Sequence, residues 1–408
     1  MANRPYPVIT VNEKAARSLR AGHPWVYGAE TSGPDRPCQN GDLVDVVSQK
    51  GRWLGTGLYN NHSKILVRLL SRNTNDRFDE GFWRRRLRYA LDYRKTVMGP
   101  DYGCCRLIFG EADQFPGLTV DRFGDILVTE VLSLGMEVRK DLLYPLLVEL
   151  LREDGVTVRA IYERSDAPLR DKEGLPRLTG FYPLPGLATD LDGHLLLEEN
   201  GIRYDVDYIQ GQKTGFFLDQ KYNRRAAAAL APGRKVLDCF THTGAFALNC
   251  AQAGAAQVTA VDISQEAVAL TQRNAALNGL EGKVEARQAD VFDLLTQLAQ
   301  AGGHPYDYII LDPPAFTKSG ATVKNAFRGY KEINYKAMKL LPRGGYLATC
   351  SCSHFMTPAL FCQMLREAAA DAAVSLRQIA DRRQAPDHPI LWGVPETEYL
   401  KFYLFQVI

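Results

Sequence analysis

A regular alternation of apolar runs and helix-length periodic segments after residue 230 constrains the fold more than any other feature. The apolar runs cover residues 235–240, 258–263, 306–312 and 345–350, with a weaker run at 283–290. Strands that are separated by helices predict a doubly wound parallel sheet. The aromatic run at 399–408 predicts a further strand that closes the edge of this sheet in the opposite direction.

Acidic residues mark the ends of the predicted strands, where a doubly wound sheet has its ligand crevice. They are Asp238, Asp262, Asp290 and Asp312 in chain order. Asp262 follows Asp238 by 24 residues, a distance at which a carboxylate accepts hydrogen bonds from ribose hydroxyls. The first turn contains Gly244 but no GxGxxG pattern, so it disfavours a pyrophosphate-bearing dinucleotide. The pattern favours S-adenosylmethionine (SAM); the alternative is a non-binding domain in which these acids only cap helices and turns.

The fourth and fifth strands lead into residues that carry chemistry. Asp312 is followed by Pro-Pro, which continues neither a strand nor a helix and therefore fixes a rigid loop at the crevice. The fifth strand ends in Thr-Cys-Ser-Cys-Ser-His, which places Cys350 near the strand end and Cys352 beyond it, across from Asp312. The sequence predicts that Cys239, Cys250 and Cys362 are small buried hydrophobes.

A thiol and an acid in this arrangement suit cytosine methylation. Carbon 5 of cytosine becomes nucleophilic when a thiolate adds to carbon 6, and a hydrogen bond at nitrogen 3 assists that addition. Asp312 is suited to form the hydrogen bond at nitrogen 3. The sequence does not reveal the base that removes the carbon 5 proton.

The first 95 residues carry most of the positive charge. They hold 17 Lys and Arg against nine Asp and Glu, a net charge of +8, whereas the whole chain has +2. A predicted helix at 78–98 contributes Arg84, Arg85 and Arg88. One interpretation is that this charge binds the phosphate backbone of a nucleic acid. The other is that it forms a basic surface that only contacts solvent.

Composition excludes several classes of protein. With 46% hydrophobic and 24% charged residues the chain is globular, and no apolar run is long enough for a bilayer. The first ten residues lack a secretory signal, so we expect a cytoplasmic protein whose eight cysteines are free thiols. No CxxC pair or histidine cluster suggests a metal site.

The amino-terminal half predicts two smaller folds. Short extended runs at 6–11, 42–47, 53–58 and 65–70, with a helix at 13–20, are typical of a small β barrel. A hairpin around 118–125, a helix at 136–151 and a strand at 159–164 follow, and 165–195 reads as a connector with strand pieces.

Taken together, these residues resemble the RlmI-like family of SAM-dependent 23S ribosomal RNA cytosine-5 methyltransferases. The segment Lys14–Tyr27, which contains Gly-His-Pro-Trp-Val-Tyr, looks like the start of that family's PUA domain. The strings at 107–124 and 161–166 are similar to its central domain, and Gly211–Gln220 with Arg224 resembles the entrance to its catalytic domain.

The resemblance implies an α/β protein with a PUA-like RNA-binding barrel at 1–75, a central α+β domain at 76–190 and a Rossmann-like class I methyltransferase domain at 191–408. It implies a nucleophile at Cys352, a substrate loop with Asp312 and Phe316, and ribosomal RNA as partner, and it leaves the oligomeric state open, a homodimer included. The implied cofactor contacts are Phe217, Gln220, Asp238, Phe240, Gly244, Asp262 and Asp290. The expected RNA contacts are Arg17, Arg20, His23, Trp25, Arg84, Arg85 and Arg88.

The sequence also departs from the family pattern. Ala315 stands where the family often has Lys, and His242 and Ala245 replace the usual Tyr and Gly of the first turn. Cys350 adds a second thiol, so it competes with Cys352 for the role of nucleophile. Two alternatives stay open: a guanine-N7 ribosomal RNA methyltransferase, which needs no cysteine, and an RNA-binding protein with an inactive methyltransferase domain.

Overall fold

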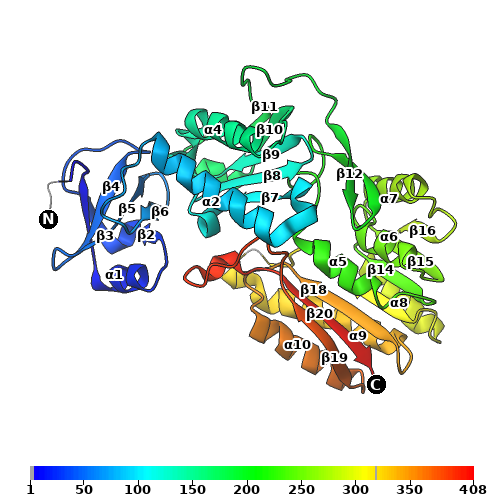
Figure 1. The fold of residues 1–408 in the computed structure, drawn as a ribbon. Helices are drawn as coiled ribbons and strands as arrows, with labels where there is room; N and C mark the ends of the chain where they lie inside the picture. Colours follow the sequence, from blue (N-terminus) through cyan, green and yellow to red (C-terminus); the bar gives the residue numbers. More distant parts are fainter. Residues whose placement is uncertain (1–3, 318) are drawn as a thin grey trace. The chain divides into compact units, whose positions relative to one another are not determined.

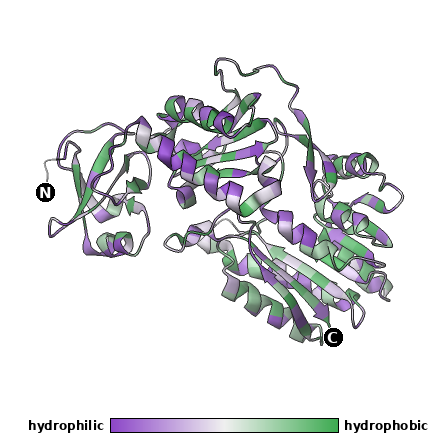
Figure 2. Cartoon of the chain, in the orientation of Figure 1, coloured by the Kyte–Doolittle hydropathy of each residue, from purple (hydrophilic) through white to green (hydrophobic). Residues whose placement is uncertain are grey.

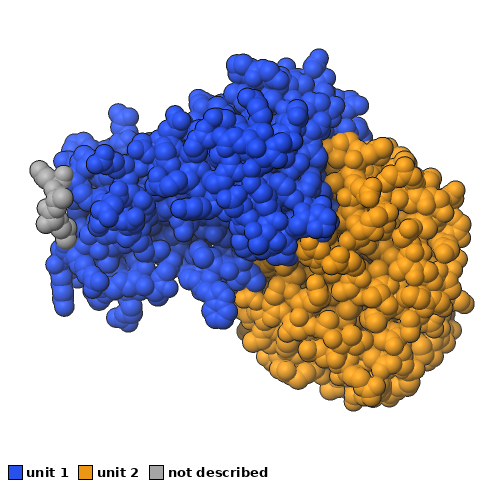
Figure 3. Space-filling view, viewed as in Figure 1, with its two compact units in different colours: residues 1–194, 207–216, 386–397 blue, residues 195–206, 217–385, 398–408 orange. Residues whose placement is uncertain are grey.

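The computed structural model describes residues 4–317 and 319–408, and the chain divides into two compact units (Figure 3). Unit 1 comprises residues 1–194, 207–216 and 386–397, and unit 2 comprises residues 195–206, 217–385 and 398–408. The chain therefore passes between the units several times. The division into three domains stays a prediction, and its first two domains both fall within unit 1.

The first sheet of unit 1 has six strands in the order β2-β6-β5-β4-β1-β3. Their bounds are β1 (Val8–Val11), β2 (Trp25–Tyr27), β3 (Thr31–Pro34), β4 (Leu43–Ser48), β5 (Trp53–Tyr59) and β6 (Ile65–Ser71). Helix α1 (Glu13–Arg20) begins where the Asn12 side chain accepts a hydrogen bond from the Ala15 amide. Alternate residues of β1 and β4 face the buried core. The sequence missed β2 because it has only three residues, and it missed β3 because its Thr-Ser-Gly-Pro sequence contains no large apolar side chain.

The second sheet of unit 1 has five strands in the order β11-β10-β9-β8-β7 (Figure 1). They are β7 (Cys104–Phe109), β8 (Leu118–Phe123), β9 (Ile126–Val131), β10 (Ala160–Ser165) and β11 (Leu178–Phe181). The antiparallel pairing of β8 with β9 confirms the hairpin. The helices are α2 (Glu80–Met98), α3 (Leu134–Glu137) and α4 (Lys140–Glu153). The single helix predicted at 136–151 is wrong, because the segment is divided into α3 and α4.

Buried polar contacts hold the two late segments of the chain in unit 1. Arg94 of α2 is fully buried and donates to the carbonyl of Asp387 over 2.9 Å. Asp387 in turn accepts from the amide of Arg106 on β7 over 2.9 Å. Thr214 donates to the buried carboxylate of Asp121 on β8 over 2.5 Å. Because a buried charge without partners is costly, these contacts fix both segments firmly against the sheet.

Unit 2 is built on a seven-stranded sheet in the order β16-β15-β14-β17-β18-β20-β19. The strands are β14 (Lys235–Cys239), β15 (Gln257–Asp262), β16 (Val284–Gln288), β17 (Tyr308–Leu311), β18 (Tyr346–Ser351), β19 (Leu376–Arg382) and β20 (Lys401–Val407). The first five in this order are parallel, and β20 runs antiparallel to both of its neighbours. A separate two-stranded sheet pairs β12 (His194–Glu199) with β13 (Ile202–Asp207). The doubly wound sheet is thereby confirmed.

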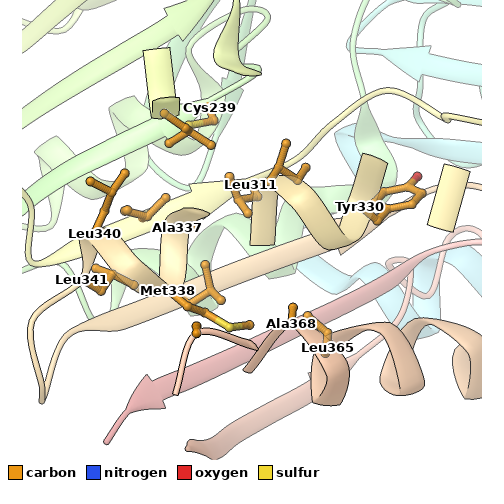
Figure 4. Packing of buried hydrophobic residues seen from close by; sticks show 14 of the residues in the cluster. Cys239, Leu311, Tyr330, Ala337, Met338, Leu340, Leu341, Leu365 and Ala368 are labelled. Atoms are coloured by element: carbon orange, nitrogen blue, oxygen red, sulfur yellow. The ribbon is translucent and has the colours of Figure 1, made fainter. Parts of the chain in front are cut away.

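Helices cover both faces of this sheet. Because successive side chains of a strand point to opposite faces, neighbouring residues pack against different helices. The helices are α5 (Lys221–Ala228), α6 (Ala245–Gln252), α7 (Gln265–Leu277), α8 (Val291–Ala301), α9 (Val323–Leu340) and α10 (Pro358–Asp371). Cys239 and Leu311 pack into the cluster formed with α8, α9 and α10 (Figure 4). Asp238 points to the other face, where its carboxylate accepts from the amide of Ala247 on α6. Figure 2 shows the contrast between these apolar strands and the polar helix α2 of unit 1.

Two sequence predictions in unit 2 were wrong. Strand β20 does not close the sheet edge, because β19 pairs with it on the outer side. The polar residues of β19 hid this strand from the sequence analysis. Asp290 does not end a strand either, since β16 stops at Gln288 and Asp290 caps α8, where its carboxylate accepts from the amides of Phe292 and Asp293.

Candidate active site

The turn between β14 and α6 is strained. Phe240 and His242 adopt positive φ angles of +65° and +52°, although neither is glycine. Gly244 has φ +80°, and a Cβ atom there would lie 2.7 Å from the Thr271 side chain. Non-glycine residues in this region cost free energy and cluster at functional sites. The turn is therefore shaped for close approach to a ligand at the carboxyl end of β14.

Asp238 is the most perturbed carboxyl of this turn. Only 1% of the residue is exposed, and Oδ2 accepts from the Thr241 hydroxyl over 2.6 Å and from the Ala247 amide over 3.0 Å. The other oxygen, Oδ1, is buried and has no hydrogen-bond partner among residues 4–317 and 319–408. Burial raises the pKa of Asp238 to about 7, and the nearby carboxylates of Asp312 and Asp262 add to this shift. An acceptor left unpaired in this way suits a donor group on a ligand.

Asp262 ends β15 with its carboxylate fixed by the backbone. Oδ2 accepts from the amide of His242, and Oδ1 accepts from the amide of Ser264, each over 3.0 Å. The next residue, Ile263, is 65% exposed, which is unusual for an apolar side chain that follows a buried strand. An oriented acid beside an exposed apolar side chain suits a nucleoside, with hydroxyls on one part and a flat ring on the other. The sequence analysis missed Ile263 because its exposure depends on where the strand stops.

Phe217 and Gln220 reach the same end of the sheet from the segment before α5. The Phe217 ring meets the His242 ring edge to face, with 4.9 Å between the centroids. Gln220 is buried, and its Nε2 donates to Asp312 over 3.1 Å, while its Oε1 accepts from Asn223 over 2.7 Å. Gln220 thus holds the acid of the Asp-Pro-Pro loop.

The Asp-Pro-Pro loop, residues 312–317, is tied to the segment that follows β18. Phe316 packs on the ring of Tyr330, with 4.6 Å between centroids. The carbonyl of Thr317 accepts from the Ser353 hydroxyl over 2.8 Å. Ser353 comes directly after Cys352, so the acid loop and the thiol segment form one connected structure.

The two thiols at the end of β18 differ in environment. Cys350 lies inside the strand and is fully buried, and burial together with the Asp312 carboxylate raises its pKa well above the ordinary value. Cys352 lies one residue past the strand and is partly exposed. Of the other predicted small hydrophobes, Cys239 and Cys250 are buried as expected, whereas the prediction was wrong for Cys362, which is half-buried. All eight cysteines lie in the described residues, and none forms a disulfide.

The basic residues of α1 and the segment after it lie on unit 1. Arg17 and Arg20 are exposed, and Arg20 pairs with Glu13 over 2.8 Å. His23 and Trp25 are half-buried and pack edge to face with 5.1 Å between centroids. Both rings have acidic partners: His23 lies 3.2 Å from Glu396, and Trp25 Nε1 donates to Glu111 over 3.0 Å. Exposed guanidinium groups such as those of Arg17 and Arg20 suit a nucleic acid.

The three arginines expected on α2 are not equally available. Arg84 binds two glutamates of α4, at 2.5 and 3.0 Å. Arg88 binds Glu153 and Asp154 at 2.6 and 2.7 Å. Arg85 is more than half exposed, and its nearest acid, Asp76, is 3.7 Å away. A phosphate group therefore competes with fewer internal partners at Arg85.

A groove in unit 1 runs between β6 and the face of α2 that carries Arg85. Its lining includes Arg72, Arg85, Arg86 and Tyr89. Arg72 and Arg86 donate to backbone carbonyls. Tyr89 is 67% exposed. The groove thus combines cations with an exposed aromatic ring, and the sequence analysis missed it because Arg72 and α2 are brought together only by the fold.

Comparison with known proteins identifies the class. The family described as S-adenosylmethionine-dependent methyltransferase matches residues 189–406, and the PUA-like domain family matches residues 9–72. A protein named ribosomal RNA large subunit methyltransferase I from Shewanella denitrificans is 42% identical over 94% of this chain and 95% of its own length. One with the same name from Klebsiella pneumoniae is 37% identical over the full length of both chains. The chain therefore belongs to the ribosomal RNA large subunit methyltransferase I family and is a SAM-dependent methyltransferase.

Solved structures agree with the fold. A candidate SAM-dependent methyltransferase from Streptococcus mutans has a TM-score of 0.81, with 21% identity over 98% of this chain and 99% of its own. A related structure in complex with S-adenosylhomocysteine has a TM-score of 0.82 at 21% identity, with the same coverage. At this identity the likeness concerns the fold. It confirms the Rossmann-like class of unit 2 and the barrel that precedes it.

No group of three or more His, Cys, Asp or Glu side chains that could hold a metal ion occurs in residues 4–317 and 319–408. Within the same residues, no helix has both the length and the apolar character that crossing a membrane requires.

Proposed function

We propose that this protein transfers a methyl group from SAM to carbon 5 of a cytosine in 23S ribosomal RNA, through a covalent bond between Cys352 and the base. The observation that carries the proposal is the placement of Asp312 and a partly exposed thiol at Cys352 just past the carboxyl ends of the neighbouring parallel strands β17 and β18. The segments that follow these strands are linked by the hydrogen bond from Ser353 to Thr317. The names of the relatives support ribosomal RNA of the large subunit as substrate.

The residues at this end of the sheet fit SAM. We assign the ribose hydroxyls to Asp262 and the adenine ring to a contact with Ile263, whose side chain is exposed beside that carboxylate. The unpaired Oδ1 of Asp238 suits a donor on the cofactor. We further assign cofactor contacts to Phe217, Gln220, Phe240, Gly244 and Asp290, all of which border this end of the sheet. When bound, SAM supplies an electrophilic methyl group.

Cys352 and Asp312 act on the base. The Cys352 thiolate forms a bond to carbon 6, and the electrons of the carbon 5–carbon 6 double bond become available at carbon 5. In its protonated form the Asp312 carboxyl donates a hydrogen bond to ring nitrogen 3, which draws electron density away from carbon 6 during the addition. After carbon 5 has gained the methyl group, a proton acceptor removes the proton from carbon 5. The carbon 5–carbon 6 double bond then re-forms, and the Cys352 thiolate leaves carbon 6. Burial keeps Cys350 protonated, so it is the poorer nucleophile.

RNA affinity is assigned to unit 1. We propose contacts from Arg17, Arg20, His23 and Trp25, and from Arg84, Arg85 and Arg88 of α2. Arg85 shares the groove with Arg72 and Tyr89, where a phosphate and a stacked base can both be accommodated. Arg84 and Arg88 must release acidic partners to bind phosphate. A cytoplasmic location and a homodimer stay predictions.

The experiment that tests the proposal identifies the methylated nucleoside. Purified protein is incubated with methyl-labelled SAM and unmodified 23S ribosomal RNA, which is then digested and analysed by mass spectrometry. The expected product is 5-methylcytidine. A 7-methylguanosine product would establish the guanine-N7 alternative, and absence of label with intact RNA binding would establish an inactive domain.

A further inference from the structure

A buried lysine lies next to the thiol segment. Lys401 is the first residue of β20, it is 1% exposed, and it is paired in register with Ser351, the residue before Cys352. Its Nζ donates to the carbonyl of Ser353, the residue after Cys352, over 2.6 Å. Lys401 therefore contacts the chain on both sides of Cys352. Its backbone pairs with Ser351 in the sheet, and its ammonium binds the carbonyl of Ser353.

The ammonium of Lys401 has carbonyl partners but no paired carboxylate. Its second hydrogen bond goes to the carbonyl of Tyr399 over 2.7 Å, and among the described residues no Asp or Glu forms an ion pair with it. A buried ammonium in this setting carries a large desolvation cost.

Charged and titratable groups surround Lys401 and Cys352 on several elements. Burial, the Asp312 carboxylate and Cys352 all raise the pKa of Cys350 on β18, so Cys350 adds no charge, and Asp312 is the anion on this side. Burial lowers the pKa of Lys401 to about 8; Cys352 and Glu398 act in the opposite direction, and Arg383 after β19 acts in the same direction. Tyr330 of α9 also faces Cys352, and burial holds the pKa of that phenol above its ordinary value, so it adds no charge. At neutral pH most of the Lys401 side chain is still protonated. Its positive charge therefore interacts favourably with a thiolate at Cys352.

We propose that Lys401 is a positioning residue for Cys352: its ammonium holds the segment after β18 in place and stabilises the thiolate that attacks the base. This inference rests on the proposed role of Cys352. A nearby cation lowers the pKa of a thiol, and the thiolate is the nucleophile. The sequence analysis missed this pair because Cys352 and Lys401 are 49 positions apart and come together through the pairing of β18 with β20.

The test measures the reactivity of the Cys352 thiol rather than methyl transfer. Full-length protein is alkylated with iodoacetamide across a pH series, and the peptide that carries Cys352 is quantified by mass spectrometry. Lys401→Met should move the midpoint of the alkylation profile upward by about one pH unit, which lowers the rate near pH 7 by about tenfold. Lys401→Arg keeps the charge and should restore most of the reactivity. Lys331→Met, which removes a surface lysine of α9, is the matched control and should leave the profile unchanged.

Lys401→Gln separates charge from hydrogen bonding, because its amide still donates to the Ser353 carbonyl. If Lys401→Gln shifts the alkylation midpoint as much as Lys401→Met does, the effect is due to charge. If Lys401→Met does not fold, Lys401→Gln alone provides the test. An unchanged midpoint in a folded, SAM-binding Lys401→Gln protein would overturn the proposal. The proposed function fails separately: if Cys352→Ala still transfers methyl groups while the midpoint depends on Lys401, the thiol is tuned but is not the nucleophile.

Discussion

Replacing Asp238 with Asn should remove a pH-dependent loss of stability from the protein without ligand. In the folded protein Asp238 keeps its proton up to about pH 7, whereas in the unfolded chain it loses the proton near its ordinary pKa of 3.8. The group therefore contributes stability that is complete below about pH 3.8 and is lost as the pH rises through 7. Since each pKa unit corresponds to about 1.4 kcal/mol, the loss between pH 5 and pH 8 is about 2–3 kcal/mol.

Asparagine preserves the shape but cannot be charged. Its side-chain oxygen can accept from Thr241 and Ala247, and its NH2 group takes the position of the unpaired Oδ1. Any cost of that unpaired NH2 is the same at both pH values, so the difference between them isolates ionisation. Urea unfolding of wild type and Asp238→Asn at pH 5 and pH 8 should show the variant gaining about 2 kcal/mol, relative to wild type, at the higher pH. An equal stability difference at both pH values would refute the reasoning.

The same variant connects stability with the cofactor. If the unpaired oxygen of Asp238 accepts a donor from SAM, the variant should bind SAM at least tenfold more weakly by calorimetry at pH 8, where Asp238 is ionised, since a charged hydrogen bond contributes about 1.5–3 kcal/mol. A more stable protein with unchanged SAM affinity would remove Asp238 from the cofactor site. It would leave the carboxyl as a structural feature of the turn.

Three further predictions concern the cofactor turn and the RNA surface. Asp262→Ala should weaken SAM binding about tenfold to a hundredfold, measured by calorimetry, because it removes the acceptor assigned to the ribose; unchanged affinity in a folded protein would contradict the assignment. Gly244→Ala should lower the free energy of unfolding by more than Gly233→Ala, because both have positive φ but only the first adds a clash with α7; equal losses would show that the turn relaxes. Arg85→Ala should flatten the plot of log affinity for RNA against log salt by about 0.7–0.9, and more than Arg84→Ala, which is paired with α4; identical slopes would mean that this face is only solvated.

The sequence predicted the parts of the fold that depend on local pattern. Asp262 ends β15 as predicted, and Asp238 and Asp312 lie within one residue of the ends of β14 and β17. These positions follow from apolar runs and from the rule that parallel strands gather their carboxyl ends on one edge. The position of Cys352 beyond the strand follows from the same reasoning. These predictions need no knowledge of which strands pair.

The features that were missed depend on contacts between distant residues. Strand β19 consists mostly of polar residues, so its sequence does not predict a strand. Among the described residues it pairs with β20 alone, and this pairing defines it. The ion pairs of Arg84 and Arg88 require α4 to lie beside α2, so the helix sequence alone makes both arginines look free. Asp290 looked like a strand end because a helix cap and a strand terminus share the same residue preference.

The most direct test of the central claim is a covalent trap. RNA in which the target cytosine is replaced by 5-fluorocytosine cannot lose its carbon 5 substituent, so the bond from sulfur to carbon 6 should persist through denaturation. With SAM present, wild type and Cys350→Ala should form this adduct, Cys352→Ala should not, and peptide mapping should find the RNA on Cys352. An adduct formed by Cys352→Ala, or one mapped to Cys350, would contradict the assignment of the nucleophile. Absence of any adduct from a wild-type protein that methylates unmodified RNA would contradict the covalent mechanism itself.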